Sequence, residues 1–483
     1  CALPISSSSD GVLVKGTKGI EIAPSSTITT GGARATLWSR SGSTNASTDL
    51  GAIQLGNSST ITTNGGAITL AGSTSTDSAT GLPNGYALSN TASRGGVGLG
   101  LSAVGNGTTA QLNSGGGAIQ VRGKSTIDGA WGVAIYPGVS INSGVGRILI
   151  DGWATGTLDG VAIDSTSTAK TTITSAAVAD SNTPAISITG DCDSTSTSTT
   201  EQRGIWMGTS GLTISATAGG DVSLTATASA THATNPGAIY IQGSDIIAST
   251  GYVKLDGGSV GVVTSIAGGT TNLGSLSSGS ATGAVKIVGD KITNAGSTTI
   301  RTSGSATIEP SSQSFSSAHT FGSAWTFTGV TGTNLGNIGS VTIGQSGTGG
   351  VVSRATQNTA DITLSKAITS SGSISVFGGA VAISANQATT SNGDITVSST
   401  GTYSGAATLN ASGAVAVTSS VFSGTGALTS AGAGGITVTA TAGDLTTGAA
   451  ITANTSTAAP IVLKATANLV INNALQSNGG PVT

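Results

Sequence analysis

Short segments in which apolar and polar residues alternate recur along the whole chain, and a glycine precedes most of them. Three lie close together: "GSISVFG" begins at Gly372, "GAVAIS" at Gly379 and "GDITVSS" at Gly393. These glycines are 7 and 14 positions apart, and similar steps elsewhere give a period of about 22 residues. Alternation with period two indicates a strand with one buried face. The chain is therefore predicted to be a stack of short strands.

A parallel β-helix is the fold that best accommodates such strands, because each coil pairs its backbone with the next coil. Glycine and the β-branched Thr, Val and Ile disfavour helix. An antiparallel sandwich array is the alternative fold. In the segment from 372 to 400, six side chains are expected to point into one narrow core: Ile374, Val376, Val381, Ile383, Ile395 and Val397.

Composition excludes several functions. Only 8% of the 483 residues are charged, against roughly 25% in an ordinary domain, and the net charge is -3. No basic patch for nucleic acid is present, and no apolar run is long enough to span a membrane. Cys1 and Cys192 belong to no Cys/His cluster, so no metal or other cofactor is expected.

Breaks in the repeat predict the domain organisation. One β-helix segment is expected over 1–310, with polar loops bulging out near 73–96 and 191–204. An aromatic-containing break at 311–329 would separate it from a second segment over 330–483. This second segment ends in "SNGGPVT" without a polar cap, although solenoids normally carry one. We expect either that the sequence is an excerpt of a longer array, or that subunits stack head to tail into filaments.

The best candidate for a carbohydrate site is a pair of similar segments, "TIDGAW" and "LIDGWA". Asp128 and Asp151 are 23 positions apart, about one coil, and would stack on adjacent coils. Two tryptophans and two arginines lie near them: Trp131, Trp153, Arg122 and Arg147. Paired carboxylates cleave glycans, but Asp-Gly is also a turn signal and a corner tryptophan also plugs a solenoid. We predict no catalytic residue and retain glycan contact as a hypothesis.

A second group of side chains is aromatic and consists of Phe315, Phe321, Trp325 and Phe327. Such a group forms a local core under a loop or, where exposed, a contact surface. The two histidines, His232 and His319, have no neighbouring carboxylate in the sequence and are expected at the surface. Ice binding, a further possibility for a Thr-rich solenoid, needs evenly spaced threonine rows, which steps of 7, 8, 14 and 15 do not provide.

The segment 339–400 carries a resemblance to a known family. Its elements "TIG", "ADITL", "GSISVFGG" and "GDITV" resemble repeats of very large bacterial exoproteins related to filamentous haemagglutinin. The resemblance implies a right-handed parallel β-helix, export by a two-partner or autotransporter route, and a role in adhesion, aggregation or surface fibres. An Asn-Pro-Asn-Gly secretion signature is not found; Leu82–Tyr86 reads only "LPNGY".

The sequence thus predicts a non-enzymatic, extracellular bacterial protein, a β-helical rod that contributes to a surface fibre, filament, biofilm matrix or adhesin. Its expected partners are further copies of itself and host or cell-surface glycans. The alternative is a carbohydrate-binding or carbohydrate-cleaving β-helix of the polysaccharide lyase type. Cleavage of uronic or neutral glycans would distinguish the two.

Overall fold

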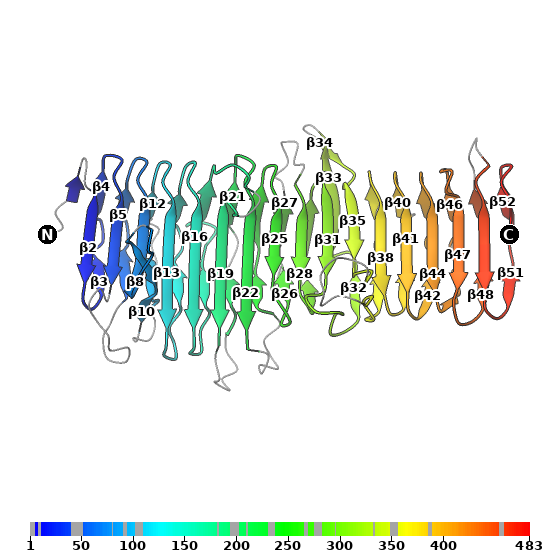
Figure 1. Cartoon of the computed structure of the whole chain (residues 1–483), viewed down its shortest axis with the longest axis horizontal. Helices are drawn as coiled ribbons and strands as arrows, with labels where there is room; N and C mark the ends of the chain where they lie inside the picture. Colours follow the sequence, from blue (N-terminus) through cyan, green and yellow to red (C-terminus); the bar gives the residue numbers. More distant parts are fainter. Residues whose placement is uncertain are drawn as a thin grey trace. The chain divides into compact units, whose positions relative to one another are not determined.

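The chain forms an all-β parallel β-helix in which every regular element is a strand within the residues that the computed structural model describes (Figure 1). These residues are 5–7, 11–39, 52–79, 81–89, 94–101, 110–180, 183–193, 202–208, 211–229, 237–264, 269–274, 283–294, 296–331, 334–347, 356–384, 389–453 and 458–483. The chain divides into two compact units. The first contains Cys1–Gly274 and Thr293–Ser297, and the second contains Ser275–Ile292 and Thr298–Thr483.

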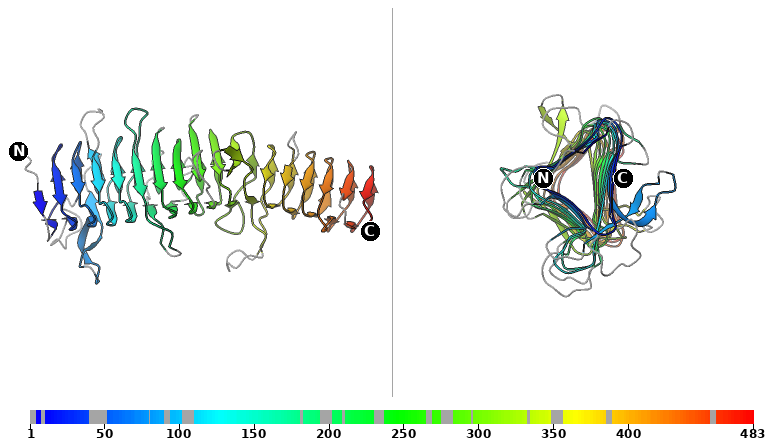
Figure 2. Two further views of the ribbon diagram at one scale, coloured as in Figure 1. Left: turned by 90° about the horizontal axis from the view of Figure 1, so that it is seen from above. Right: turned by 90° about the vertical axis from the view of Figure 1, so that its left-hand side faces the viewer.

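Three parallel sheets, named A, B and C, build the first unit, which is drawn in blue to green (Figure 2). The A sheet contains β1 (Ile5–Ser7), β4 (Thr27–Thr30), β7 (Thr60–Thr62), β12 (Gln111–Asn113), β15 (Ser140–Asn142), β18 (Thr172–Ser175), β21 (Leu212–Ala216), β24 (Ser244–Ala248) and β27 (Thr270–Gly274). The B sheet contains β2 (Val12–Gly16), β5 (Ala35–Ser39), β8 (Ile68–Thr76), β13 (Ile119–Ser125), β16 (Ile148–Ala154), β19 (Ile186–Cys192), β22 (Val222–Ala228) and β25 (Val253–Asp256). The C sheet contains β3 (Ile20–Ile22), β6 (Ile53–Gly56), β11 (Val97–Leu101), β14 (Val133–Ile135), β17 (Val161–Ile163), β20 (Ile205–Met207), β23 (Ile239–Ile241) and β26 (Val262–Thr264).

The second unit also consists of three parallel sheets, named D, E and F. The D sheet contains β28 (Val285–Val288), β31 (Ser305–Glu309), β35 (Ser340–Ile343), β38 (Ile374–Gly378), β41 (Ile395–Ser399), β44 (Val415–Ser419), β47 (Ile436–Ala440) and β50 (Ile461–Ala465). The E sheet contains β32 (His319–Phe321), β36 (Ile362–Leu364), β39 (Val381–Ile383), β42 (Thr402–Gly405), β45 (Val421–Phe422), β48 (Leu445–Thr447) and β51 (Leu469–Ile471). The F sheet contains β37 (Thr369–Ser370), β40 (Thr389–Ser391), β43 (Leu409–Ala411), β46 (Leu428–Ser430), β49 (Ile451–Ala453) and β52 (Leu475–Ser477).

Six further strands complete the described elements. They are β9 (Pro83–Gly85), β10 (Ala87–Ser89), β29 (Ile292–Asn294), β30 (Ser297–Arg301), β33 (Trp325–Thr331) and β34 (Asn334–Gly336). Of these, β10 pairs parallel with β13, and β30 pairs parallel with β33. Two of the described pairings are antiparallel, β8 with β9 and β33 with β34. The segment with β9 projects from the coils of the first unit in both views of Figure 2.

Coil length varies along the chain. Ile374 pairs with Ile395, 21 positions on, and Ile395 pairs with Val415, 20 positions on, so the predicted period of about 22 holds in this segment. Earlier in the second unit, Ile308 pairs with Ile343, 35 positions on. In the first unit the hydroxyl of Thr63 contacts its counterpart in the next coil, Ser114, across 51 positions. Insertions between strands lengthen these coils without disturbing the strand register.

The predicted phase of the strands in 372–400 is confirmed. Ile374, Val376, Val381, Ile383, Ile395 and Val397 are each at most 1% exposed. In register, Ile374 lies on Ile395 and Val376 on Val397, so that each apolar side chain packs on one from the next coil. Burial at roughly 25 cal/mol per Å² of apolar surface makes these stacked rows the main stabilising term of the fold.

A hydroxyl-containing corner connects the A sheet to the B sheet. Thr63 donates its hydroxyl to the carbonyl of Gly66 and, at 3.2 Å, to that of Ser114. The corner needs left-handed backbone, and φ is +52° at Asn64 and +119° at Gly65. A Cβ at Gly66 would overlap the carbonyl of Ala33 in the preceding coil. The motif Thr-Asn-Gly-Gly thus specifies a tight corner against a neighbouring backbone.

A similar corner, with left-handed backbone at the glycine, recurs in the second unit. Ser477 donates its hydroxyl at 2.5 Å to the carbonyl of Gly480, and φ at Gly479 is +82°. After it, Val482 forms a parallel bridge with Ile461 of β50. "SNGGPVT" therefore repeats the internal "TNGG" corner in structure as well as in sequence.

The structure describes most of the three segments in which the sequence repeat breaks. The segment 73–96 does leave the coil, but it is not a strand-free polar loop, because it contains the end of β8 and all of β9 and β10. The segment 311–329 lies inside the second unit, and the division between the units comes before it, at Gly274/Ser275 and Ile292–Thr298. In 191–204, Asp191 and Cys192 belong to β19, and 194–201 lie outside the described residues.

Candidate functional site

The outer face of the B sheet carries the densest group of charged and aromatic side chains described in the first unit. On β19 and β22 most outward positions are Ser or Thr, such as Ser187 and Ser223. From β13 to β19, two outward rows carry charged and aromatic side chains instead. In the first, Arg122 of β13 lies beside Asp151 of β16. In the second, Lys124, Trp153 and Asp191 lie on successive strands. We name this group, with Tyr86, the B-face cluster.

Arg122 and Asp151 form an ion pair that is largely shielded from solvent. The Nε and Nη2 atoms of Arg122 donate to Asp151 Oδ2 at 3.0 and 2.7 Å. Tyr86 Oη donates to the same oxygen at 3.0 Å. Asp151 is 6% exposed, and charge-assisted hydrogen bonds of this length are stronger than neutral ones. The three groups therefore hold one another in fixed positions.

The excursion of β9 and β10 places Tyr86 over the cluster. Gly85 pairs antiparallel with Gly72 of β8, and Ala87 pairs parallel with Gly123 of β13. Tyr86, between these two pairings, has its ring 5.1 Å from the Arg122 guanidinium carbon. Arg122 Nη1 also donates to the carbonyl of Asn84 in β9. The excursion is thus fastened to the B sheet by the cluster itself.

Lys124, Trp153 and Asp191 form the more accessible part of the cluster. Lys124 Nζ lies 3.2 Å from the centroid of the Trp153 ring, a cation–π contact. The Tyr86 ring meets Trp153 edge to face, with centroids 6.2 Å apart. Asp191 accepts a hydrogen bond of 2.6 Å from the hydroxyl of Thr227 on β22. One row therefore offers an aromatic ring, a cation and a carboxyl group.

Burial changes the protonation behaviour of the cluster. It raises the pKa of Tyr86 to about 12, and the neighbouring Asp151 acts in the same direction. Burial also lowers the pKa of Lys124, against an opposing effect of Asp193, and raises the pKa of Asp191. Tyr86 hence stays protonated at neutral pH and keeps its hydrogen bond to Asp151. Hydroxyl donors and acceptors beside an aromatic ring suit recognition of a sugar.

The predicted pairing of Asp128 with Asp151 is wrong. Asp151 lies in register with Arg122, 29 positions earlier, because the local coil is longer than 23 residues. Asp128 is exposed in the turn after β13, where the N–H of its neighbour Gly129 donates to the Thr157 hydroxyl at 3.0 Å. An insertion between the coils separates the two similar "IDG" segments.

The tryptophans of the two segments also lie apart. Trp153 belongs to β16 and the B-face cluster, whereas Trp131 precedes β14 of the C sheet. Trp131 packs edge to face on Tyr136, with centroids 6.4 Å apart. Arg147 pairs with Asp180 at 3.0 Å and is not part of the cluster. Of the four predicted glycan contacts, the structure brings together only Asp151 and Trp153.

The sequence did not indicate Tyr86, Lys124 and Asp191 as members of this site. Lys124 and Asp191 flank Trp153 only once the coil lengths of 29 and 38 residues that join β13, β16 and β19 are known. Tyr86 reaches the cluster through an excursion that was expected to be a loop. The one available signal was alternation, which places Arg122 and Lys124, or Asp151 and Trp153, on one side of a strand.

The aromatic segment of the second unit forms a local core. Phe315, Phe321 and Trp325 are 3–4% exposed, and the Phe321 and Trp325 rings lie 5.4 Å apart. Phe327 is partly exposed beside Trp325, with ring centroids 6.3 Å apart. The core interpretation is supported, and three of the four rings are not accessible as a contact surface.

His319 is buried, contrary to the expectation that it lies at the surface. It is 7% exposed, and its Nε2 accepts a hydrogen bond of 3.1 Å from the N–H of Ile292. Its ring lies 4.5 Å from that of Phe315. Sequence neighbours do not show this environment, because Ile292 is 27 positions away. Cys1 and His232 lie outside the described residues.

No group of three or more His, Cys, Asp or Glu side chains is arranged to hold a metal ion in the described part of the chain. None of the described residues belongs to a helix with the length and hydropathy of a membrane span. No family model, no curated protein and no solved structure matches this chain.

Proposed function

We propose that this protein is a non-enzymatic bacterial surface protein, a β-helical adhesin or matrix component that contacts glycans through its B-face cluster. The row of Lys124, Trp153 and Asp191 carries the proposal, because it combines a ring for the apolar face of a sugar with a hydroxyl donor and acceptor. The resemblance of 339–400 to filamentous-haemagglutinin repeats favours an extracellular adhesive role over an intracellular one.

The hydrogen bonds and positions of the carboxyl groups favour a non-enzymatic role over glycan cleavage. Asp151 already accepts hydrogen bonds from Arg122 and Tyr86, so it is poorly placed to take a proton from a substrate. Asp128, the other carboxyl group that a cleavage mechanism would use, is not its neighbour. Self-association into filaments remains part of the proposal for a surface fibre.

A glycan array with two matched tryptophan variants tests the glycan contact. We expect Trp153→Ala to weaken binding by about tenfold or more, since an aromatic platform and its cation–π partner are lost. Trp131→Ala, which removes the same side chain beside the C sheet, should bind like the unmodified protein. Equal binding by both variants, with unchanged circular dichroism, would contradict the proposal.

The non-enzymatic assignment has a separate test. The protein is incubated with uronic-acid and neutral polysaccharides, and chain length is followed by size-exclusion chromatography. We expect no shortening. Shortening that Asp151→Ala abolishes would replace the proposal with the polysaccharide-lyase alternative.

A further inference from the structure

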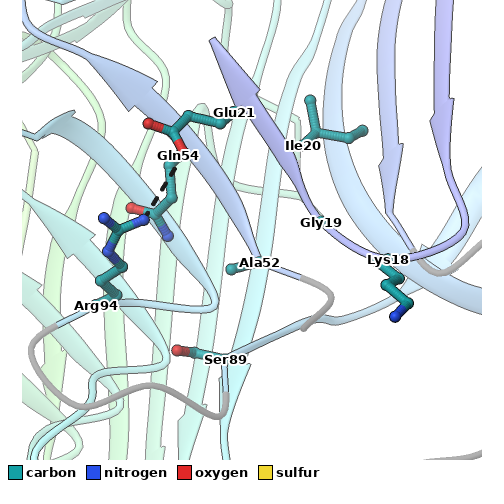
Figure 3. Close-up of a pocket in the computed structure, with 8 residues that line it drawn as sticks. All are labelled: Lys18, Gly19, Ile20, Glu21, Ala52, Gln54, Ser89 and Arg94. Atoms are coloured by element: carbon teal, nitrogen blue, oxygen red, sulfur yellow. Dashed lines mark ion pairs between the residues drawn. The ribbon is translucent and has the colours of Figure 1, made fainter. Parts of the chain in front are cut away.

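A cleft of about 490 Å³ lies on the outer side of the C sheet of the first unit (Figure 3). Its volume falls within the range of small-molecule sites. Both ionic and apolar groups line it: Lys18, Gly19, Ile20, Glu21, Ala52, Gln54, Ser89 and Arg94. None of these residues belongs to the B-face cluster.

Two cations and one acid give the cleft a local excess of positive charge. Arg94 Nη1 lies 3.9 Å from Glu21 Oε2, and their side chains are 45% and 68% exposed. An exposed ion pair of this length contributes little stability and exchanges readily with other ions. Lys18 lies exposed on the same cleft. A carboxylate entering the cleft would therefore meet Lys18 directly and compete with Glu21 for Arg94.

Gln54 provides a polar group at the base of the cleft. It lies in register between Glu21 of β3 and Gly98 of β11. A Cβ at position 98 would overlap Gln54 Oε1, so glycine is required for the amide to lie there. Nε2 donates to the carbonyl of Gly95 at 2.7 Å, whereas Oε1 has no donor among the residues that the structure describes, although Gln54 is 3% exposed. A buried acceptor without a donor is costly, and a hydroxyl donor would relieve that cost.

The remaining lining suits the body of a sugar. Ala52 offers apolar surface beside the largely buried Ile20, whereas Ser89 at the end of β10 is 0% exposed. Cation, hydroxyl acceptor and apolar surface together match a sugar that carries a carboxylate. Figure 3 shows Arg94 and Glu21 on one side of the cleft and Lys18 on the other.

We infer that this cleft binds a carboxylated sugar such as a uronic acid. The carboxylate binds Arg94 and Lys18, and the ring hydroxyls reach Glu21 and the Gln54 amide. The inference does not depend on the B-face cluster, because it uses different residues on a different sheet. The sugar can be free or part of an acidic polysaccharide, and the two sources share the same recognition chemistry.

Isothermal titration calorimetry with four ligands tests the inference: galacturonic acid, an oligogalacturonate, galactose and acetate. We expect one or both uronates to bind at least about tenfold more tightly than galactose or acetate. Uronate binding by the oligomer alone assigns the site to a polysaccharide. Binding of acetate as strong as that of uronate, equal binding of galactose, or no uronate binding would each overturn the inference.

Variants locate the binding within the cleft. Arg94→Gln should weaken uronate binding by about tenfold, whereas Glu21→Gln should strengthen it severalfold, because it removes the competitor for Arg94. The control is Arg147→Gln, which replaces a partly exposed arginine of the same unit that pairs with Asp180; it should leave uronate binding unchanged. Trp153→Ala should also leave uronate binding unchanged. The uronate site and the glycan contact of the B-face cluster can therefore be refuted separately. Unchanged affinity in Arg94→Gln would overturn the inference.

Discussion

Val376 and Ser375 are neighbours in β38 with opposite environments, since Val376 is 0% exposed in the core and Ser375 faces outward. A lysine at Val376 would place an unpaired charge in the narrow core and should cost several kcal/mol. A lysine at Ser375 should be tolerated, because its ammonium reaches water. Thermal melts followed by circular dichroism should separate the two variants clearly. Equal melting temperatures would show that the strand phase is wrong.

The corner hydroxyls make a second prediction at the scale of single residues. Thr63→Val keeps the shape of the side chain but removes the donor to the carbonyls of Gly66 and Ser114. We expect a loss of about 1–3 kcal/mol in the free energy of unfolding, since two hydrogen bonds of the corner are lost, although the Ser114 carbonyl keeps the N–H of Gly65 as a donor. Thr62→Val is the matched control, because Thr62 faces outward at the end of β7. Urea titration of both variants measures the difference; a loss as large in Thr62→Val would contradict the role of the corner.

His319 makes the stability of the second unit depend on pH. Burial lowers its pKa, and Lys291 acts in the same direction. The unfolded chain therefore takes up a proton from about pH 6.5 downward, while the folded chain resists protonation because Nε2 accepts the Ile292 N–H. The contribution of His319 is complete above that pH and is lost as pH falls towards its lowered folded pKa.

The measurement is the urea midpoint between pH 7.5 and pH 5. We expect a smaller fall in His319→Gln than in the unmodified protein, because this variant removes the titrating group. Carboxyl groups titrate alike in both proteins, so their effect cancels in the comparison. Parallel pH profiles would refute the assignment.

At the scale of elements, alternation determines what the B strands can tolerate. Inserting one alanine between Val121 and Arg122 would exchange the inner and outer faces for the rest of β13. We expect the insertion to have one of two effects. Either the protein no longer folds stably, or Arg122 no longer pairs with Asp151 and glycan binding is reduced. The same insertion after Ile127, in the turn that follows β13, should leave both intact. Circular dichroism and the glycan array report the two effects; equal damage by both insertions would contradict this account.

The elements also show how far sequence reasoning reaches. In 372–400 the strands and their buried faces were predictable, because the coil is short and its glycines mark the corners. In the first unit the register was not predictable, since coils of 29 to 51 residues carry insertions that alternation does not measure. Asp151 and Trp153 were found because they share one strand. Tyr86 was not, because its position depends on pairings with two strands.

At the scale of the whole molecule, every described parallel strand pairing joins residues at least 19 positions apart, as in Ile362 with Val381. Loop closure must precede each such contact, so parallel β structure folds slowly. We expect refolding from urea to take about a second or longer, on the slow side of all-β proteins. Stopped-flow tryptophan fluorescence would measure it. Complete recovery within a few milliseconds would contradict the expectation.

The corner between the A and B sheets has a practical consequence. Because hydroxyl–carbonyl bonds at Thr63, and likewise at Ser477, fix where the next strand begins, the distance along the chain to the following corner is left open. Strands that are 20 positions apart and strands that are 51 positions apart both pair in parallel with their neighbours in the next coil. Such a molecule can display foreign peptides: a segment spliced into the turn at Asp77–Ala79 would extend sideways while the strands keep their partners.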